Sequence, residues 1–132
     1  MFTAMSVSAT ALEAQKVRMN VSASNIANVN STRTPDGSGP YRRKDVHFSS
    51  YMMKEGVYGV DVTGIVEDPR PFRKVFDPGH PDADPEGYVT FPNVNIIEEM
   101  VNMMTAGRAY EANITAINNT KSMMMKALEI GR

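Results

Sequence analysis

Apolar residues recur at alternating three- and four-residue steps in two segments of the sequence, one near each end of the chain. The first segment runs from about Thr3 to Val29, and the second begins at Ile96 and continues past Leu128. This spacing places the apolar residues on one face of a helix, and over such a length it is typical of helices that supercoil around a partner. The pattern therefore predicts a long helix at each end of the chain.

The apolar face of each predicted helix is the set of positions that we expect to contact other helices and other subunits. In the first helix these positions are Phe2, Met5, Leu12, Met19 and Ile26, and in the second they are Ile96, Met100, Met103, Tyr110, Ile114, Ile117, Met124 and Leu128. Each face also contains one lysine, Lys16 and Lys121. A polar residue at such a position lowers stability and can fix the register of the pairing.

Further apolar residues flank the face of the second helix: Ile97, Val101 and Met104 near its start, and Met123 and Met125 near its end. One interpretation is a wide core face within a helical bundle. The other, which we favour, is that the helix packs against several neighbours, some of them from other subunits. A chain of 132 residues has little other sequence to cover two faces of a helix that is roughly 54 Å long.

The sequence also predicts where the second helix begins and ends. Asn95 is a good N-cap residue, and Glu98 follows it at the spacing of a capping box. Gly131 is predicted to end the helix as a left-handed C-cap. Because the first helix is only roughly 40 Å long, part of the second helix must project past it.

The middle of the chain, about Arg33 to Pro92, contains all the prolines and most of the glycines. Its β-like segments are 41–48, 56–66, 72–76 and 88–91, with a loop rich in proline and aspartate at 77–87. The sequence therefore predicts an α+β fold, in which long N- and C-terminal helices pair as a coiled coil and a small β-rich region lies between them. We place the boundaries at 1–32, 33–92 and 93–132.

Composition excludes several classes of protein. The net charge of −1 gives no strong attraction to nucleic acid or to an anionic membrane. The absence of cysteine excludes disulfides, thiolate metal sites and thiol nucleophiles. No apolar run approaches the roughly 20 residues of a membrane span, and no cleavable signal peptide is visible at the N-terminus.

Three acidic residues invite comparison with a calcium-binding loop. Asp82, Asp84 and Glu86 match its first, third and fifth ligand positions, but Asn93 stands where a bidentate glutamate is required. We therefore favour a solvated turn over a calcium site, and we expect no metal and no other cofactor.

The remaining candidates for chemistry are weaker. His47 and His80 have no carboxylate and nucleophile at a recognisable spacing, so we expect no enzymatic activity and no small-molecule substrate. The basic run Arg42-Arg43-Lys44 has no interleaved aromatic residue beyond Tyr41, and we interpret it as a solvated strand edge and not as a nucleic-acid site.

Two sets of motifs carry a resemblance to a known family. The segment Ser22-Ala-Ser-Asn-Ile-Ala-Asn28 resembles the N-terminal signature of the axial proteins of the bacterial flagellum, which include rod and hook subunits. The second half is more specific and is similar to proximal-rod subunits of that family. Its matching motifs are Asp77-Pro-Gly-His-Pro-Asp-Ala-Asp84, Pro92-Asn-Val-Asn95 and Arg108-Ala-Tyr-Glu-Ala-Asn-Ile114.

The resemblance implies a structural, non-enzymatic subunit of the proximal rod in the flagellar basal body. It implies export through the flagellar type III apparatus without signal cleavage, and assembly in the periplasm. Expected partners are other proximal-rod proteins, the distal rod protein, the rod-to-ring adaptor protein and copies of the chain itself. Asn25 and Asn28 would belong to the helical region that lines the assembly. The alternative is a soluble coiled-coil module that binds one partner at a fixed small stoichiometry.

Overall fold

The computed structural model describes residues 2–131, so the outermost residue of each terminal domain predicted above lies outside the described residues. The elements are α1 (Phe2–Ala27), β1 (Lys44–Lys54), β2 (Val57–Glu67), β3 (Arg73–Phe76), β4 (Tyr88–Phe91) and α2 (Ile96–Ile130). The predicted α+β class, with a long helix at each end and small strands between them, is confirmed.

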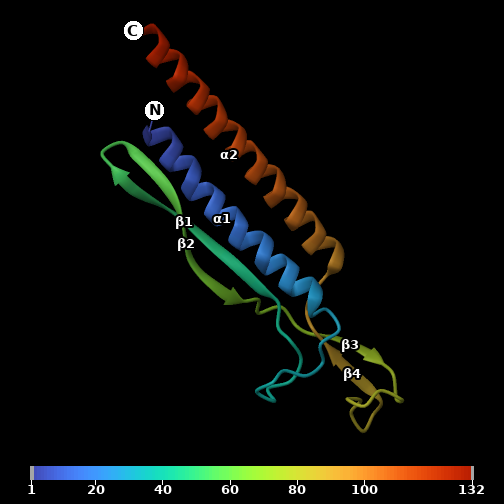
Figure 1. Cartoon of the computed structure of the whole chain (residues 1–132). Helices are drawn as coiled ribbons and strands as arrows, with labels where there is room; N and C mark the ends of the chain where they lie inside the picture. The colour runs from blue at the N-terminus through green and yellow to red at the C-terminus, as the bar shows by residue number, and fades with distance from the viewer. Residues whose placement is uncertain (1, 132) are drawn as a thin grey trace.

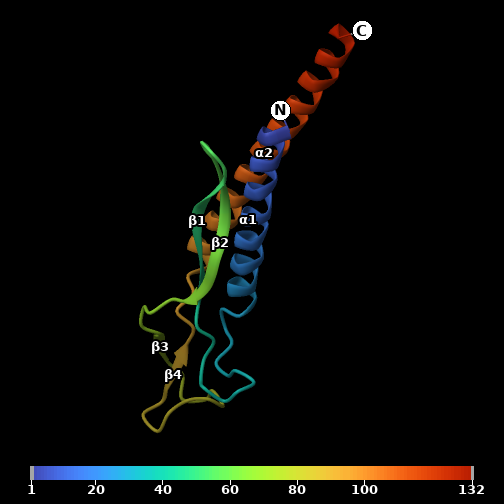
Figure 2. The ribbon, with the colours of Figure 1, turned by 90° about the vertical axis from the view of Figure 1, so that its left-hand side faces the viewer.

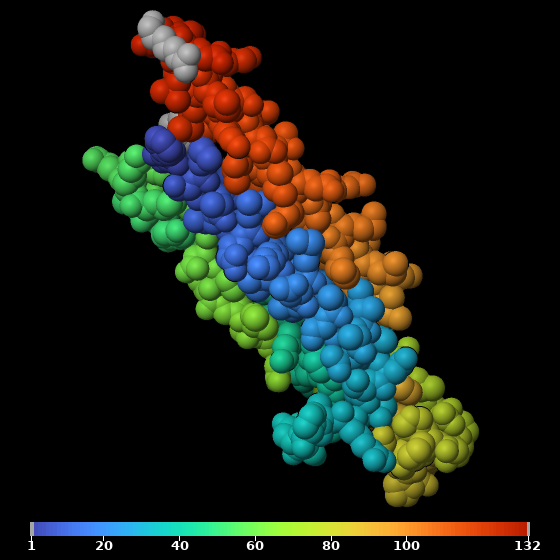
Figure 3. Space-filling model, in the orientation of Figure 1, coloured from blue at the N-terminus to red at the C-terminus, as the bar shows by residue number. Residues whose placement is uncertain are grey.

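The helices α1 and α2 lie side by side, and the C-terminal part of α2 projects past the start of α1 (Figure 1). This follows from their lengths, because α1 has 26 residues and α2 has 35. The space-filling view shows the C-terminal end standing clear of the rest of an elongated molecule (Figure 3). The prediction that the second helix overhangs the first is confirmed. No helix within residues 2–131 has an apolar stretch sufficient to cross a membrane.

Small residues are the buried apolar positions of the two helices. Ala14 of α1 and Ala106 of α2 are buried, and neither belongs to the apolar faces defined from the sequence. Leu12 and Met103, which do belong to those faces, are half-buried. The periodicity of large apolar residues therefore predicted the two helices but not their most deeply buried apolar positions.

The antiparallel pair β1–β2 forms a ribbon that packs along α1, on the side away from α2 (Figure 1; turned by 90° in Figure 2). Gly56 makes its turn with a φ of 75°. The first strand begins at Lys44 and continues to Lys54, so the predicted segment 41–48 was wrong at both ends. Tyr41 instead lies before the strand, where its hydroxyl donates to Asn25. The strand is long because β2 pairs with it throughout, which local alternation does not reveal.

The second hairpin, β3–β4, lies at the end of the molecule where α1 stops and α2 starts (Figure 1). Asp84 shapes the loop before β4, because its Oδ1 accepts the backbone N–H groups of Glu86 at 3.0 Å and Tyr88 at 2.9 Å. Gly87 has a φ of 93°, and a Cβ there would lie 2.8 Å from the ring of Phe76. The turn therefore requires glycine both for its backbone and for its space.

The two ends of α2 differ in how well the sequence predicted them. Asn95 is the N-cap, and its side chain accepts from the N–H groups of Ile97 at 3.0 Å and Glu98 at 3.2 Å. The predicted left-handed C-cap is wrong, since Gly131 has a φ of −75°. Its N–H donates to the carbonyl of Ala127 at 3.1 Å, so the glycine continues the helical hydrogen bonding instead of reversing the chain.

Candidate assembly interface

A long apolar surface on α2 is left uncovered by the rest of residues 2–131. Ile97, Val101 and Met104 are exposed near the start of the helix, and Ile97 is 73% exposed. Met123, Met125 and Leu128 are exposed near the end of α2, the helix whose C-terminal part projects past α1 (Figure 1). Large exposed apolar surface of this kind is typical of sites that contact another molecule.

The structure divides the residues that the sequence marked for contact into two groups. Met5, Leu12, Met19, Ile26, Met103, Tyr110, Ile117 and Met124 are half-buried, and Phe2, Ile96, Met100, Ile114 and Leu128 are exposed. The half-buried group is partly covered by other parts of the chain. The exposed group is available for contacts with other molecules.

Asn25 and Asn28 use their side chains within the chain. Asn25 has no exposed surface, and its amide donates to the carbonyl of Lys44 at 2.9 Å while its Oδ1 accepts the Lys44 N–H at 3.0 Å. The helix thereby satisfies both backbone groups of the first residue of β1, as a neighbouring strand would. Asn28 lies just after α1 and donates to the carbonyl of Ser24 at 2.9 Å, which closes the end of the helix.

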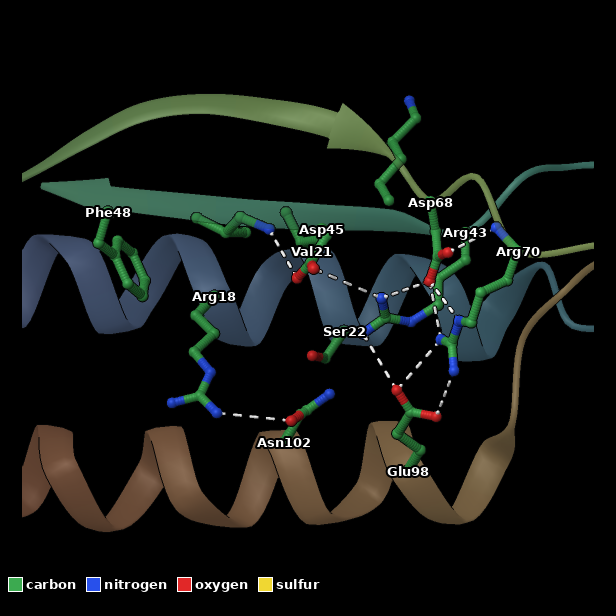
Figure 4. A pocket seen from close by; sticks show the side chains of 12 residues that line it. Arg18, Val21, Ser22, Arg43, Asp45, Phe48, Asp68, Arg70, Glu98 and Asn102 are labelled. Atoms are coloured by element: carbon green, nitrogen blue, oxygen red, sulfur yellow. Dashed lines mark hydrogen bonds and ion pairs between the residues drawn. The ribbon is translucent and has the colours of Figure 1, made fainter.

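A buried ionic cluster joins the ribbon to the start of α2. Arg43 is only 5% exposed, and its guanidinium contacts Glu99 through Nε and lies 3.1 Å from Asp68. Glu99 has no exposed surface. Arg70 also contacts Asp68, at 2.7 Å, and Glu98, at 3.2 Å (Figure 4). Asp68 and Glu99 are 25 and 56 residues away from Arg43 in the sequence, and the charges of the three side chains hold these segments together.

This cluster contradicts the interpretation of Arg42-Arg43-Lys44 as a solvated strand edge. Arg43 is buried, and Arg42 lies over the ring of Phe72 at 4.1 Å from its centre. Arg42 also donates to the carbonyls of Asp68 at 2.8 Å and Arg70 at 3.0 Å. The run was misread because its partners follow about 25 residues or more later, and no local pattern identifies them.

Comparisons with known proteins match both ends of the chain. Residues 5–33 match the family model described as "Flagella basal body rod protein", and residues 86–130 match "Flagellar basal body rod FlgEFG protein C-terminal". Flagellar basal-body rod protein FlgC of Bacillus subtilis is 47% identical over 99% of this chain and 98% of its own length. FlgC of Yersinia enterocolitica is 48% identical over 96% of this chain and 94% of its own length. The chain belongs to the FlgC family.

Membership of the FlgC family makes the chain a structural, non-enzymatic subunit of the flagellar basal-body rod. It assembles with other rod components. The family resemblance read from the motifs of the sequence is therefore confirmed. Two features of the structure stand out, the exposed face of α2 and the ionic cluster at its start.

In this FlgC-family chain the ionic cluster shifts the pKa of Asp68 and the pKa of Arg43 in opposite directions. Hydrogen bonding from the Arg70 guanidinium, against the opposing effect of burial, lowers the pKa of Asp68 to about 2. Burial disfavours the charged form of Arg43, but the hydrogen bond and charge of Glu99 outweigh it and raise the pKa of Arg43. Both groups stay charged near neutral pH, so the cluster is a permanent structural connection at that pH.

The acidic loop of the FlgC-family chain is held by contacts inside the chain. Asp82 accepts hydrogen bonds from Thr32 and Arg33, which ties the loop to the segment that follows α1. These hydrogen bonds, from Thr32 first and then Arg33, lower the pKa of Asp82. Asp84 accepts from the backbone of its own turn. Within residues 2–131 no three metal-ligating side chains are grouped closely enough to hold an ion.

Proposed function

We propose that this chain is a subunit of the proximal rod, and that it co-assembles through the exposed faces of its terminal helices. The observation that carries the proposal is the uncovered apolar surface of α2, which extends from Ile97 to the projecting end at Leu128. Each large apolar side chain that a neighbour covers contributes roughly 1.5–3 kcal/mol. Many such contacts along one helix would spread a torsional load over the whole length of the subunit.

The proposal includes a route and a set of partners. The chain is exported by the flagellar type III apparatus without cleavage of a signal peptide and joins the rod in the periplasm. Its neighbours are other proximal-rod proteins, the distal rod protein, the rod-to-ring adaptor protein and copies of itself. The predicted contact residues that are exposed form the interface with neighbouring subunits. Those that are half-buried stabilise the packing of the chain beneath that interface.

A carboxylate placed on the exposed face tests the proposal. Ile114→Asp and Val101→Asp would bury an unpaired charge in an apolar contact, at a cost of several kcal/mol. Neither position is buried within the chain, so the isolated subunit should fold and be exported normally. We expect both variants to be missing from isolated basal bodies and the cells to be non-motile.

The matched control is Asn118→Asp, which adds the same charge at an exposed polar position of the same helix. Cells with this variant should swim. The proposal is wrong if Ile114→Asp subunits are recovered in intact rods. A complex of fixed small stoichiometry between the purified chain and a single partner, without growth into larger assemblies, would instead favour a coiled-coil binding module.

A further inference from the structure

The hydroxyl of Thr10 joins α1 to the half of the β1–β2 ribbon that lies nearer the turn. Its Oγ1 accepts the backbone N–H of Val60 at 3.1 Å and donates to the carbonyl of Val7, one helical turn earlier, at 2.7 Å. Thr10 and Val60 are 50 residues apart in the sequence. A side chain of the helix therefore bonds the outer edge of β2, as a third strand would.

Gly59 allows this contact because it has no side chain. It is buried, and a Cβ at this position would lie 3.1 Å from the hydroxyl oxygen of Thr10 and 3.0 Å from the sulfur of Met53. Both separations are shorter than the best distance between non-bonded atoms. A larger residue would hold β2 away from α1, so the sequence is fitted to a close approach at this point.

The second attachment is at the base of the ribbon, where Asn25 binds both backbone groups of Lys44. The N–H and C=O groups of one strand residue point to the same edge of a sheet. The helix therefore lies against the outer edge of β1 at the base and against the outer edge of β2 near the turn. Figure 1 shows this exchange, which the twist of a two-stranded ribbon produces.

The two attachments have matching spacings on the helix and on the ribbon. Fifteen residues of α1 separate Thr10 from Asn25, which is a rise of roughly 22 Å. On the ribbon, Val60 pairs with Ser50, and the six residues from Lys44 to Ser50 span roughly 20 Å. Because the two lengths agree, both attachments form together with the ribbon lying along the helix.

We propose that Thr10 is a positioning residue, which together with Asn25 fixes the direction of the ribbon and makes α1 and the ribbon one rigid body. Asn25 alone would leave the ribbon free to swing about its base, since the ionic cluster of Arg43 also lies at the base. The inference goes beyond the proposed function, because it concerns the free chain and holds whether or not the chain joins a rod.

One other side chain connects the turn end of the ribbon to α1. Lys54 donates through Nζ to Oγ1 of Thr3 at 2.7 Å, but Lys54 is exposed. Ordering a long exposed side chain costs conformational entropy that offsets such a contact. Thr3→Val, which removes this contact, is therefore the matched control for a change at Thr10.

Spin labels measure the direction of the ribbon in the purified full chain, because the absence of cysteine allows labels at chosen positions. One label replaces Glu55 at the exposed turn, and the other replaces Ala23 at an exposed position of α1. Pulsed electron paramagnetic resonance gives the distribution of distances between them. We expect a narrow distribution in the parent, in Thr3→Val and in Thr10→Ser, which keeps the hydroxyl. Thr10→Val, which keeps the shape without the hydroxyl, should give a broad one.

Hydrogen exchange provides a second measurement that needs no substitution. In the parent chain, followed by nuclear magnetic resonance, the amide of Val60 should exchange more slowly than the amide of Val62, the next residue on the same edge. This comparison decides the question if Thr10→Val does not fold.

The inference is overturned if the parent gives a broad distribution of distances or if Thr10→Val stays narrow. A lower melting temperature of Thr10→Val with a narrow distribution would show a stabilising role and no positioning role. The inference also fails if Thr10→Ser broadens as much as Thr10→Val, or if Val60 and Val62 exchange at the same rate.

Discussion

Removal of Glu99 should destabilise the chain more than removal of any exposed charge. Glu99→Ala leaves the guanidinium of Arg43 buried without its closest partner, and breaking a buried pair from one side costs about 3–5 kcal/mol. Because Asp68 remains 3.1 Å from Arg43, we expect the lower end of this range, about 3 kcal/mol. For a chain of this size that corresponds to a fall in the melting temperature of about 10 °C.

Urea unfolding of the purified subunit, followed by circular dichroism, measures this change. Glu98→Gln is the matched control, because the neighbouring carboxylate is partly exposed and its loss should cost at most about 1 kcal/mol. The double variant Arg43→Met with Glu99→Leu removes both charges and should regain most of the stability that Glu99→Ala loses. If Glu99→Ala and Glu98→Gln unfold at the same urea concentration, the cluster does not hold the fold together.

Four further predictions follow from particular contacts. The pKa of Asp68 is about 2 in the folded chain, below its ordinary value of 3.8, so its contribution to stability is complete above about pH 4 and is lost as the pH falls toward 2; urea midpoints measured across this range should fall, and Asp68→Asn should flatten the curve. Gly87→Ala should lower the free energy of unfolding by more than about 1 kcal/mol because of its positive φ and the contact with Phe76, whereas an alanine at exposed Gly37 would be strained only by its backbone and should cost less. In the free subunit, residues 118–130 should be the first cleaved by limited proteolysis, since nearly all of them are exposed; equal protection of this segment and of the β1–β2 ribbon would contradict this prediction. Calorimetry with millimolar calcium should show no saturable heat, and a one-site isotherm that disappears in Asp84→Ala would show the opposite.

The parts of the fold that the sequence predicted are those determined by neighbouring residues. The helix at each end follows from apolar periodicity, and Asn95 as N-cap follows from one side chain and two nearby N–H groups. The extent of β1 was missed because pairing with β2 sets it, and Gly131 was misjudged because a glycine near a helix end also fits a continued helix.

The candidate interface was predictable in part, because the local spacing of apolar residues identifies which positions share a helix face. Exposed Ile97, Val101 and Met104 were recognised as apolar positions in excess of a two-helix contact. The partners of Arg43 were not recognised from the sequence, because Asp68 and Glu99 are 25 and 56 residues away from it. The sequence offers one weak signal, the two consecutive glutamates at the start of α2, but the helix dipole also favours acidic residues in the first turn of a helix.

The position of the contacts that hold the β1–β2 ribbon determines where this fold can accept extra sequence. Its base is fixed by Asn25, which binds both backbone groups of Lys44, and by the hydrogen bond of 2.8 Å from the N–H of Asp68 to the carbonyl of Arg43. Its turn at Gly56 is free, with open space where a side chain would be. Extra sequence inserted at that turn would extend outward from a base that does not move. The surfaces of the two helices and the β-rich middle region can therefore change independently. A single pair of helices can support middle regions of very different length.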